Sequence, residues 1–265
     1  MTDMYQRYAL FFDIDGTLVS FNTHEIPPST ILALTQAKAN GSRVYIATGR
    51  PPLIITNLGA IEHLIDGYIS TNGALCFVGQ QTVSCLPIDK QDVMTCVEDA
   101  QAKHYSLIVV GTKDVGVIDP KGDVDRIFRK TLAVKNLDKA IPIEEALRQD
   151  ILQLTPFFPA DYEPLLLARM PKCISGRWHP EFTDITACGA DKGKGILAMA
   201  RHEGFDPSRT IAFGDGGNDI SMIRQAGIGI AMGNAIDELK RQADYVTTSV
   251  DDDGIRRALR HFQVI

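Results

Sequence analysis

The chain of 265 residues lacks the features that mark several classes of protein. It has no run of basic residues and a net charge of −6, so a nucleic-acid partner is a poor electrostatic fit. Its five cysteines form no C-x-x-C pair, so they indicate neither a disulfide framework nor a zinc site. Scattered thiols of this kind are typical of a reducing compartment.

Long apolar runs are also missing. No stretch approaches the roughly 18 residues that a membrane-spanning helix needs. The amino end, MTDMYQRYALFFDID, lacks the apolar core and the cleavage site of a signal peptide. We therefore expect a cytoplasmic protein with no membrane partner.

Apolar residues make up 45% of the chain, which is enough for a large core. Short apolar runs alternate with amphipathic stretches, the pattern of parallel strands joined by helices. The runs YALFFD (8–13), RVYIATG (43–49) and TIAFGD (210–215) are the clearest strands. Because they are apolar on both sides, they predict a sheet covered on both faces.

The middle of the chain differs, because its elements are shorter and its prolines denser from about residue 82 to residue 184. We interpret residues 82–184 as an inserted α+β domain. Residues 1–81 and 185–265 would then form one core. The predicted fold class is α/β, a doubly wound parallel sheet with an inserted cap.

The first motif is FFDIDGTL (11–18), which places Asp13 and Asp15 at the end of a buried strand. Two carboxylates held close together repel each other unless a cation neutralises them, so the motif indicates a divalent metal. A turn of aspartates without a metal is the alternative. A calcium EF-hand loop is excluded, because Leu18 occupies the position where that loop requires glycine.

Two further strands end in polar turns. IATGR (46–50) ends in Thr48 and Gly49, whose hydroxyl and backbone N–H groups suit a phosphoryl oxygen. FGDGGNDIS (213–221) places Asp215 at a strand end, with Asn218 and Asp219 at the start of a helix. A calcium-binding β-helix repeat would need several copies of such a sequence, and the chain has one.

DKGKG (191–195) opens a helix with Lys192 in its first turn. A lysine is unfavourable beside the positive end of a helix dipole, unless an anion lies between them. A solvated surface lysine is the alternative. Because the carboxyl ends of parallel strands lie at one edge of the sheet, Asp13, Thr48 and Asp215 can converge there. Together these groups describe a site for phosphoryl transfer.

The motifs DIDGT, ATGR, the Lys192 helix and GDGGND, in this order, resemble those of the haloacid dehalogenase superfamily. The insert resembles the large cap of its Cof-type (subfamily IIB) phosphatases, among which hexose-phosphate phosphatases are the most similar. The resemblance covers essentially the whole chain. One departure is Asp191, which stands where the family often has a small polar residue.

The resemblance implies a role for each motif residue. Asp13 would be the nucleophile, and Asp15 would be the general acid and then the general base. Thr48, Gly49, Lys192 and Asn218 would bind the phosphoryl group. Mg²⁺ would be bound by Asp13, the Asp15 backbone carbonyl and Asp215, with Asp219 orienting them. The expected activity is Mg²⁺-dependent hydrolysis of a small phosphorylated metabolite, most simply a hexose phosphate.

Two residues of the insert, Arg177 and Trp178, are candidate substrate contacts, because sugar rings pack on aromatic rings and arginine binds oxygen groups. The alternative is that these two side chains have a structural role and pack at the hinge of the insert. Two other functions also stay open, a phosphomutase and a phosphosugar sensor without activity. The oligomeric state and the identity of the metabolite are not readable from the sequence.

Overall fold

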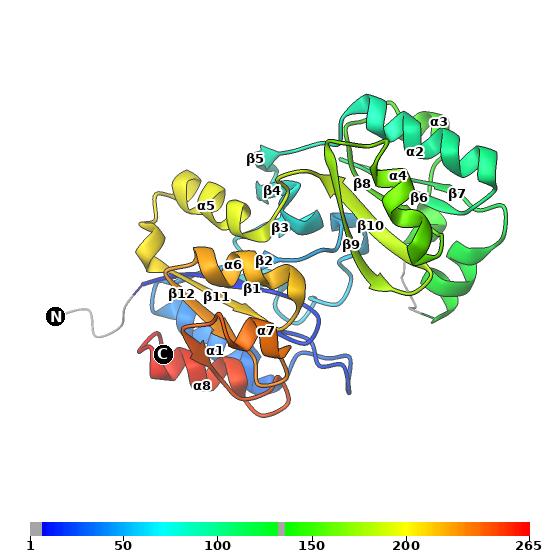
Figure 1. Ribbon diagram of the computed structural model, residues 1–265. Coiled ribbons are helices and arrows are strands. Elements are labelled where there is room, and N and C mark those ends of the chain that lie inside the picture. The colour runs from blue at the N-terminus through cyan, green and yellow to red at the C-terminus, as the bar shows by residue number, and fades with distance from the viewer. Residues whose placement is uncertain (1–6, 132–135) are drawn as a thin grey trace. The chain divides into compact units, whose positions relative to one another are not determined.

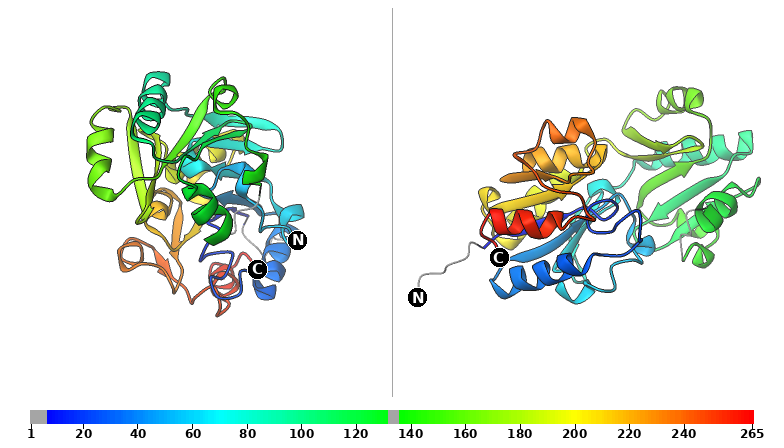
Figure 2. Two further views of the ribbon diagram at one scale, coloured as in Figure 1. Left: turned by 90° about the vertical axis from the view of Figure 1, so that its right-hand side faces the viewer. Right: turned by 90° about the horizontal axis from the view of Figure 1, so that it is seen from below.

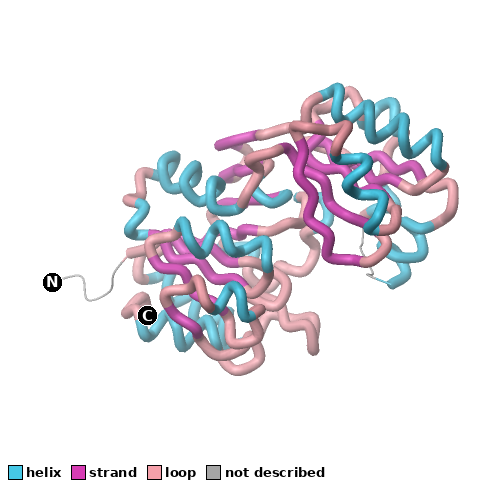
Figure 3. The backbone as a smooth tube through the Cα atoms, in the orientation of Figure 1, coloured by secondary structure: helices cyan, strands magenta, loops and turns pink. Residues whose placement is uncertain are grey.

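The computed structural model describes residues 7–131 and 136–265, with every side chain among them except those of Thr131 and Trp178. This part of the chain forms two compact units. Unit 1 contains the chain up to Gly49, together with Asn57–Cys85 and Asp191–Ile265. Unit 2 contains Arg50–Thr56 and Leu86–Ala190. Figure 3 shows that each unit has its own group of strands.

Unit 1 is built on a sheet of eight described strands. In spatial order they are β13 (Tyr245–Val246), β12 (Ile228–Ala231), β11 (Thr210–Gly214), β1 (Ala9–Phe12), β2 (Arg43–Ala47), β3 (Gly67–Ser70), β4 (Leu75–Val78) and β5 (Gln81–Cys85). The six strands from β13 to β3 are parallel, and β4 and β5 add an antiparallel edge. Every residue of β1 and β11 is buried, as their apolar runs predict.

Helices cover both faces of this sheet. They are α1 (Pro28–Ala39), α5 (Lys192–Glu203), α6 (Ile220–Gln225), α7 (Asp237–Lys240) and α8 (Gly254–His261). In Figure 1, α5 and α6 lie above the strands and α1 and α8 below them, and the right-hand view of Figure 2 shows α1 and α8 side by side. The doubly wound α/β core expected from the sequence is thus confirmed.

Local sequence signals set the limits of the helices. Helix α1 begins at Pro28, a residue preorganised for the first turn, and its last residue, Ala39, is followed by Asn40 and Gly41. Helix α5 ends at Gly204, which has a positive φ of 74°. Helix α7 has only four residues, Asp237–Lys240.

Unit 2 is built on an antiparallel sheet of five described strands. In spatial order they are β7 (Val115–Ile118), β6 (Leu107–Gly111), β8 (Ile151–Pro156), β10 (Phe182–Ala187) and β9 (Cys173–His179). Its α-helices are α2 (Lys90–Lys103), α3 (Ile143–Ala146) and α4 (Glu163–Leu167). This unit is the α+β insert that the sequence predicts between the two parts of the core.

The boundaries between the units lie a few residues later in the sequence than expected. They follow Cys85 and Ala190 rather than residues 81 and 184. Strand β5 extends unit 1 because it pairs with β4, and strand β10 extends the insert because it pairs with β8 and β9. The segment Arg50–Thr56 also belongs to unit 2. Its Leu53 packs on an apolar cluster of the insert, and Asn136 Nδ2 donates to the Leu53 carbonyl oxygen over 3.0 Å.

Among the described residues, every helix is too short or too polar to cross a membrane.

Candidate active site

Three polar strand ends converge at one edge of the unit 1 sheet. Strand β1 lies between β11 and β2, with Phe12 opposite Phe213 on one side and Ile46 on the other. Asp13 follows β1 directly, and its backbone N–H donates to the Phe213 carbonyl oxygen over 3.0 Å. The chain enters β2 on one side of β1 and returns through β11 on the other, which makes this edge a topological switch point.

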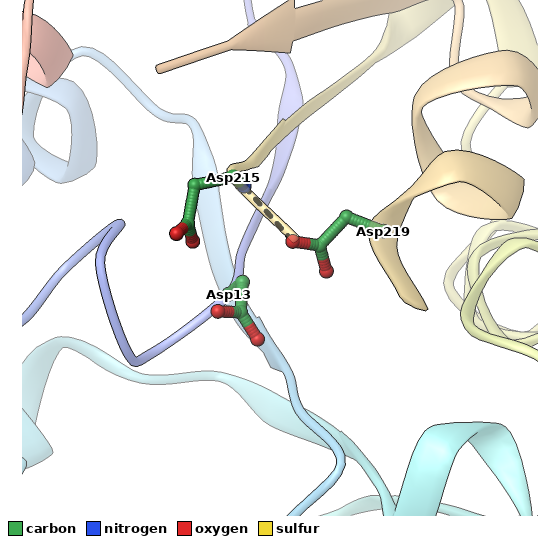
Figure 4. A group of neighbouring side chains, drawn as sticks. All are labelled: Asp13, Asp215 and Asp219. Atoms are coloured by element: carbon green, nitrogen blue, oxygen red, sulfur yellow. Dashed lines mark hydrogen bonds between the residues drawn. The ribbon is translucent and has the colours of Figure 1, made fainter. Parts of the chain in front are cut away.

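Asp13, Asp215 and Asp219 form a compact cluster at this edge. One carboxylate oxygen of each lies within 4.8 Å of the others, and Figure 4 shows the three side chains directed into the same space. Asp219 is held by its own loop, because its Oδ2 accepts the backbone N–H groups of Asp215 and Gly216, each over 2.9 Å. The loop therefore fixes the Asp219 carboxylate in its position beside Asp13 and Asp215.

Lys192 is the cation of this cluster. Its Nζ donates to Asp13 Oδ1 and to Asp219 Oδ1, each over 2.6 Å, and its side chain is fully buried. The alternative of a solvated surface lysine is therefore wrong. Burial alone would lower the pKa of Lys192, but the charges of Asp13 and Asp219 outweigh it and raise the pKa above its usual value. The anion beside this helix start comes from the chain itself.

One lysine does not neutralise the cluster. Burial, followed by repulsion from Asp219, raises the pKa of Asp13 to about 8, although Lys192 acts in the opposite direction. Burial and the charge of Asp219 raise the pKa of Asp215 to about 7. Both carboxyl groups therefore resist ionisation near neutral pH unless another positive charge is present.

The donor set fits a divalent cation that prefers oxygen ligands. Asp13 Oδ1 is used by Lys192, and Asp215 Oδ1 accepts the Thr17 hydroxyl over 3.0 Å. No described residue donates to Asp13 Oδ2 or to Asp215 Oδ2, so one oxygen of each carboxylate remains for a cation. Both oxygens of Asp219, in contrast, are already hydrogen-bonded.

The loop after Asp13 approaches Asp215 closely. Gly16 has a φ of +83°, and a Cβ at this position would lie 2.3 Å from Asp215 Oδ2. Asn234 Nδ2 donates to the Gly16 carbonyl oxygen over 2.8 Å and helps to hold the loop. Asp15 is partly exposed in this loop, and its charge contributes to the raised pKa of Asp215. Only glycine allows this approach.

Thr48, Gly49 and Asn218 meet beside the aspartates. Thr48 is buried just beyond β2, whereas Asn218 is exposed in the turn before α6. A Cβ at Gly49 would lie 3.5 Å from Asn218 Nδ2 and 3.1 Å from the Oδ1 of Asn72. Gly49 and Asn218, two of the predicted phosphate-binding residues, are thus neighbours, and the side chain of Asn72 lies beside both of them.

Three residues of the site are not predicted from the sequence. Thr17 and Asn72 contact the predicted residues Asp215 and Asn218, and Asn234 contacts the Gly16 carbonyl in the loop that contains Asp15. Thr17 lies inside the first motif and could have been found by its spacing from Asp13. Asn72 and Asn234 lie in T-N-G and G-N sequences, which are ordinary turn signals.

Asp191, which departs from the family pattern, caps helix α5. Its Oδ1 accepts the backbone N–H of Lys194 over 2.8 Å. A carboxylate at this end of a helix also compensates the helix dipole beside Lys192.

In the insert, Arg177 has partners of its own. Its Nε donates to Glu163 Oε2 over 2.6 Å, and its Nη1 donates to the carbonyl oxygens of Phe158, His179 and Pro180. The Arg177 side chain is only 17% exposed and that of Glu163 only 15%. These contacts favour the structural alternative for Arg177. The predicted contact at Trp178 lies outside the described side chains.

We expect Arg177→Ala to lower the free energy of unfolding by about 3 kcal/mol, because it leaves the mostly buried Glu163 carboxylate without its charged partner. Urea unfolding measures this loss. Arg126→Ala is the matched control, since Arg126 is 52% exposed in its ion pairs and its loss should cost less than about 1 kcal/mol. An Arg177→Ala protein of normal stability with a raised KM only for sugar phosphates would instead make Arg177 a substrate contact.

Comparison with known proteins places this geometry in context. The sequence profile of the haloacid dehalogenase-like hydrolases matches residues 10–259. A Bacillus subtilis (strain 168) protein named "Putative phosphatase YkrA" is 32% identical over 262 residues, which cover 97% of this chain and 98% of that protein.

Two solved structures are more similar. That of the sugar phosphatase BT4131, of subclass IIB of the superfamily, is 46% identical with a TM-score of 0.88 and covers 97% of this chain and 100% of its own. A second structure, from work on a conserved trigonal-bipyramidal intermediate in a phosphoryl-transfer superfamily, is also 46% identical with a TM-score of 0.88. It covers 98% of this chain and 100% of its own.

Proposed function

Because the chain belongs to the haloacid dehalogenase-like hydrolases and is a phosphatase of their subclass IIB, we propose that it hydrolyses hexose phosphates through an aspartyl-phosphate on Asp13. The observation that carries the mechanism is the position of Asp13, which is oriented by Lys192 at the strand end and retains one oxygen without a donor. The substrate class rests on the likeness to a sugar phosphatase over nearly the whole chain.

The first half of the reaction transfers the phosphoryl group to the enzyme. A carboxylate oxygen of Asp13 attacks phosphorus, and the bond between phosphorus and the sugar oxygen breaks. Asp15 gives its proton to the departing alkoxide, which leaves as the free sugar. Lys192, Thr48, the Gly49 backbone and Asn218 bind the phosphoryl oxygens, whose charge is redistributed in the transition state.

The second half returns the enzyme to its starting state. Asp15, now ionised, takes a proton from a water molecule that attacks phosphorus. The bond between Asp13 and phosphorus breaks, inorganic phosphate leaves, and both carboxyl groups are restored. This sequence needs no oxidant, and water is its only second substrate.

Asp13, the Asp15 carbonyl and Asp215 would hold Mg²⁺, with Asp219 keeping the loop in place. When bound, Mg²⁺ would supply positive charge that reduces the repulsion between the carboxylates and the incoming phosphate. Burial and the charge of Asp219 raise the pKa values of Asp13 and Asp215, and this supports the assignment, because a cation would favour the ionised forms of both groups.

We expect Mg²⁺ to stabilise the protein more at pH 8 than at pH 6. The folded pKa values of Asp13 and Asp215, about 8 and 7, lie above the unfolded value of 3.8, so ionisation costs stability as the pH rises through this range. A cation offsets that cost only for the ionised form. At a concentration of about 100 times its Kd, Mg²⁺ should raise the free energy of unfolding by about 2.7 kcal/mol.

Thermal unfolding with and without MgCl₂ at matched ionic strength measures this effect, and Asp215→Asn is the control that should lose it. A chelator should also abolish phosphate release, and Mg²⁺ should restore it. Full activity in the chelator would rule out the proposed metal.

A substrate panel tests the function itself. We expect hexose phosphates to have a higher kcat/KM than nucleotides or pyridoxal phosphate, with release of free phosphate. A phosphomutase would require a sugar bisphosphate and release no phosphate. A sensor would bind phosphosugars without turnover, although the chain retains every predicted catalytic side chain.

A further inference from the structure

A left-handed turn lies directly after β3. Three successive residues, Thr71, Asn72 and Gly73, have positive φ angles of 52°, 52° and 90°. Glycine adopts this conformation freely and asparagine tolerates it, but it is unfavourable for threonine with its branched side chain. Such strain persists only where the surroundings fix the backbone, and it is concentrated at functional sites.

The turn is fixed by two of the predicted phosphate-binding motifs. The Asn72 backbone N–H donates to the Thr48 carbonyl oxygen over 3.0 Å. On the other side, a Cβ at Gly73 would lie 2.2 Å from the carbonyl oxygen of Asp191, the residue that caps helix α5. The left-handed backbone therefore fits between the Thr48 turn and the start of the Lys192 helix.

The Asn72 side chain connects this turn to the third motif. Asn72 Oδ1 accepts a hydrogen bond from Asn218 Nδ2 over 3.1 Å. Asn218 is exposed, and its amide makes no other hydrogen bond to the described residues, so this contact orients it. Both side chains lie against Gly49, where the absence of a Cβ leaves room for them.

We propose that Asn72 is a positioning residue for phosphate binding, acting through Asn218. An amide nitrogen carries two hydrogens, and Asn72 Oδ1 accepts one of them. The second is then available to a phosphoryl oxygen at the Thr48–Gly49 turn. Asn72 thus sets the orientation of Asn218 before substrate binds, which reduces the ordering that binding requires. This inference rests on the proposed function.

The test uses Asn72→Gly, because glycine removes the side chain and keeps the left-handed backbone. We expect the inhibition constant of inorganic phosphate and the KM of a sugar phosphate to rise about five- to tenfold, the effect of one lost hydrogen bond. The melting temperature should stay close to that of the wild type. Asn136→Gly, the same substitution at a left-handed residue of the insert with φ 74°, is the matched control and should leave phosphate inhibition unchanged.

A double-mutant cycle with Asn218→Ala distinguishes positioning from a general structural role. Once Asn218 is removed, Asn72→Gly should raise the phosphate inhibition constant by less than about twofold. Asn72→Ser provides the same cycle should the glycine variant be poorly folded.

Independent effects that multiply in the double variant would overturn the inference, as would an unchanged inhibition constant with a lowered melting temperature. A wild-type protein that neither releases phosphate from esters nor is inhibited by phosphate would overturn the proposed function as well.

Discussion

Asp13→Asn is expected to lower phosphate release on the order of 10⁴–10⁶-fold, because an amide cannot act as the nucleophile. The variant should remain folded. The pKa of Asp13 is raised to about 8, so its ionised form costs stability in the protein without metal. A neutral side chain of the same shape should therefore be at least as stable at pH 8 as the wild type.

Steady-state phosphate release and thermal unfolding at pH 8 measure the two effects. Asp252→Asn is the control, since this aspartate is 61% exposed and lies outside the cluster. A variant with appreciable activity would mean that Asp13 is not the nucleophile. We expect activity to be lost without a loss of stability. A variant that is inactive because it is unfolded would contradict this expectation.

Asp15→Asn is expected to lower kcat by about 10²–10⁴-fold for a sugar phosphate, which is the usual contribution of general acid–base catalysis. Its backbone carbonyl is retained, so Mg²⁺ binding should change little. The loss in the phosphorylation step should be smaller for p-nitrophenyl phosphate, because this leaving group needs little protonation.

Single-turnover measurements with both esters separate the two possible roles of Asp15. A residue that only supports the metal through its backbone would retain most activity when changed to asparagine. An equal loss of the phosphorylation rate for both leaving groups would contradict the role of Asp15 as the general acid.

Much of the fold follows from local sequence, because the buried strands are continuous apolar runs that end in polar turns. The convergence of Asp13, Thr48 and Asp215 was predictable for the same reason, since parallel strands place their carboxyl ends at one edge. The partners of Lys192 were not. A pattern that places a lysine in the first turn of a helix cannot tell which carboxylates, far away in the sequence, surround it.

The remaining differences arise from contacts between distant segments. Arg177 stands in a sequence that suits a sugar site, but its pairing with Glu163 depends on how α4 packs beside β9. Asn72 has the sequence of a common turn, and its importance becomes visible only where three motifs meet. The limits of the insert likewise depend on strand pairing rather than on composition.

The central claim is that the phosphoryl group is transferred to Asp13, and chemical trapping tests it most directly. The enzyme would be quenched with acid during turnover of a sugar phosphate and treated with borohydride, which reduces an aspartyl-phosphate to homoserine. The peptide that contains residue 13 would then be analysed by mass spectrometry. We predict homoserine at position 13 in the wild type, and none without substrate or in Asp13→Asn. Rapid turnover with an unmodified Asp13, or with the modification at another residue, would contradict the account.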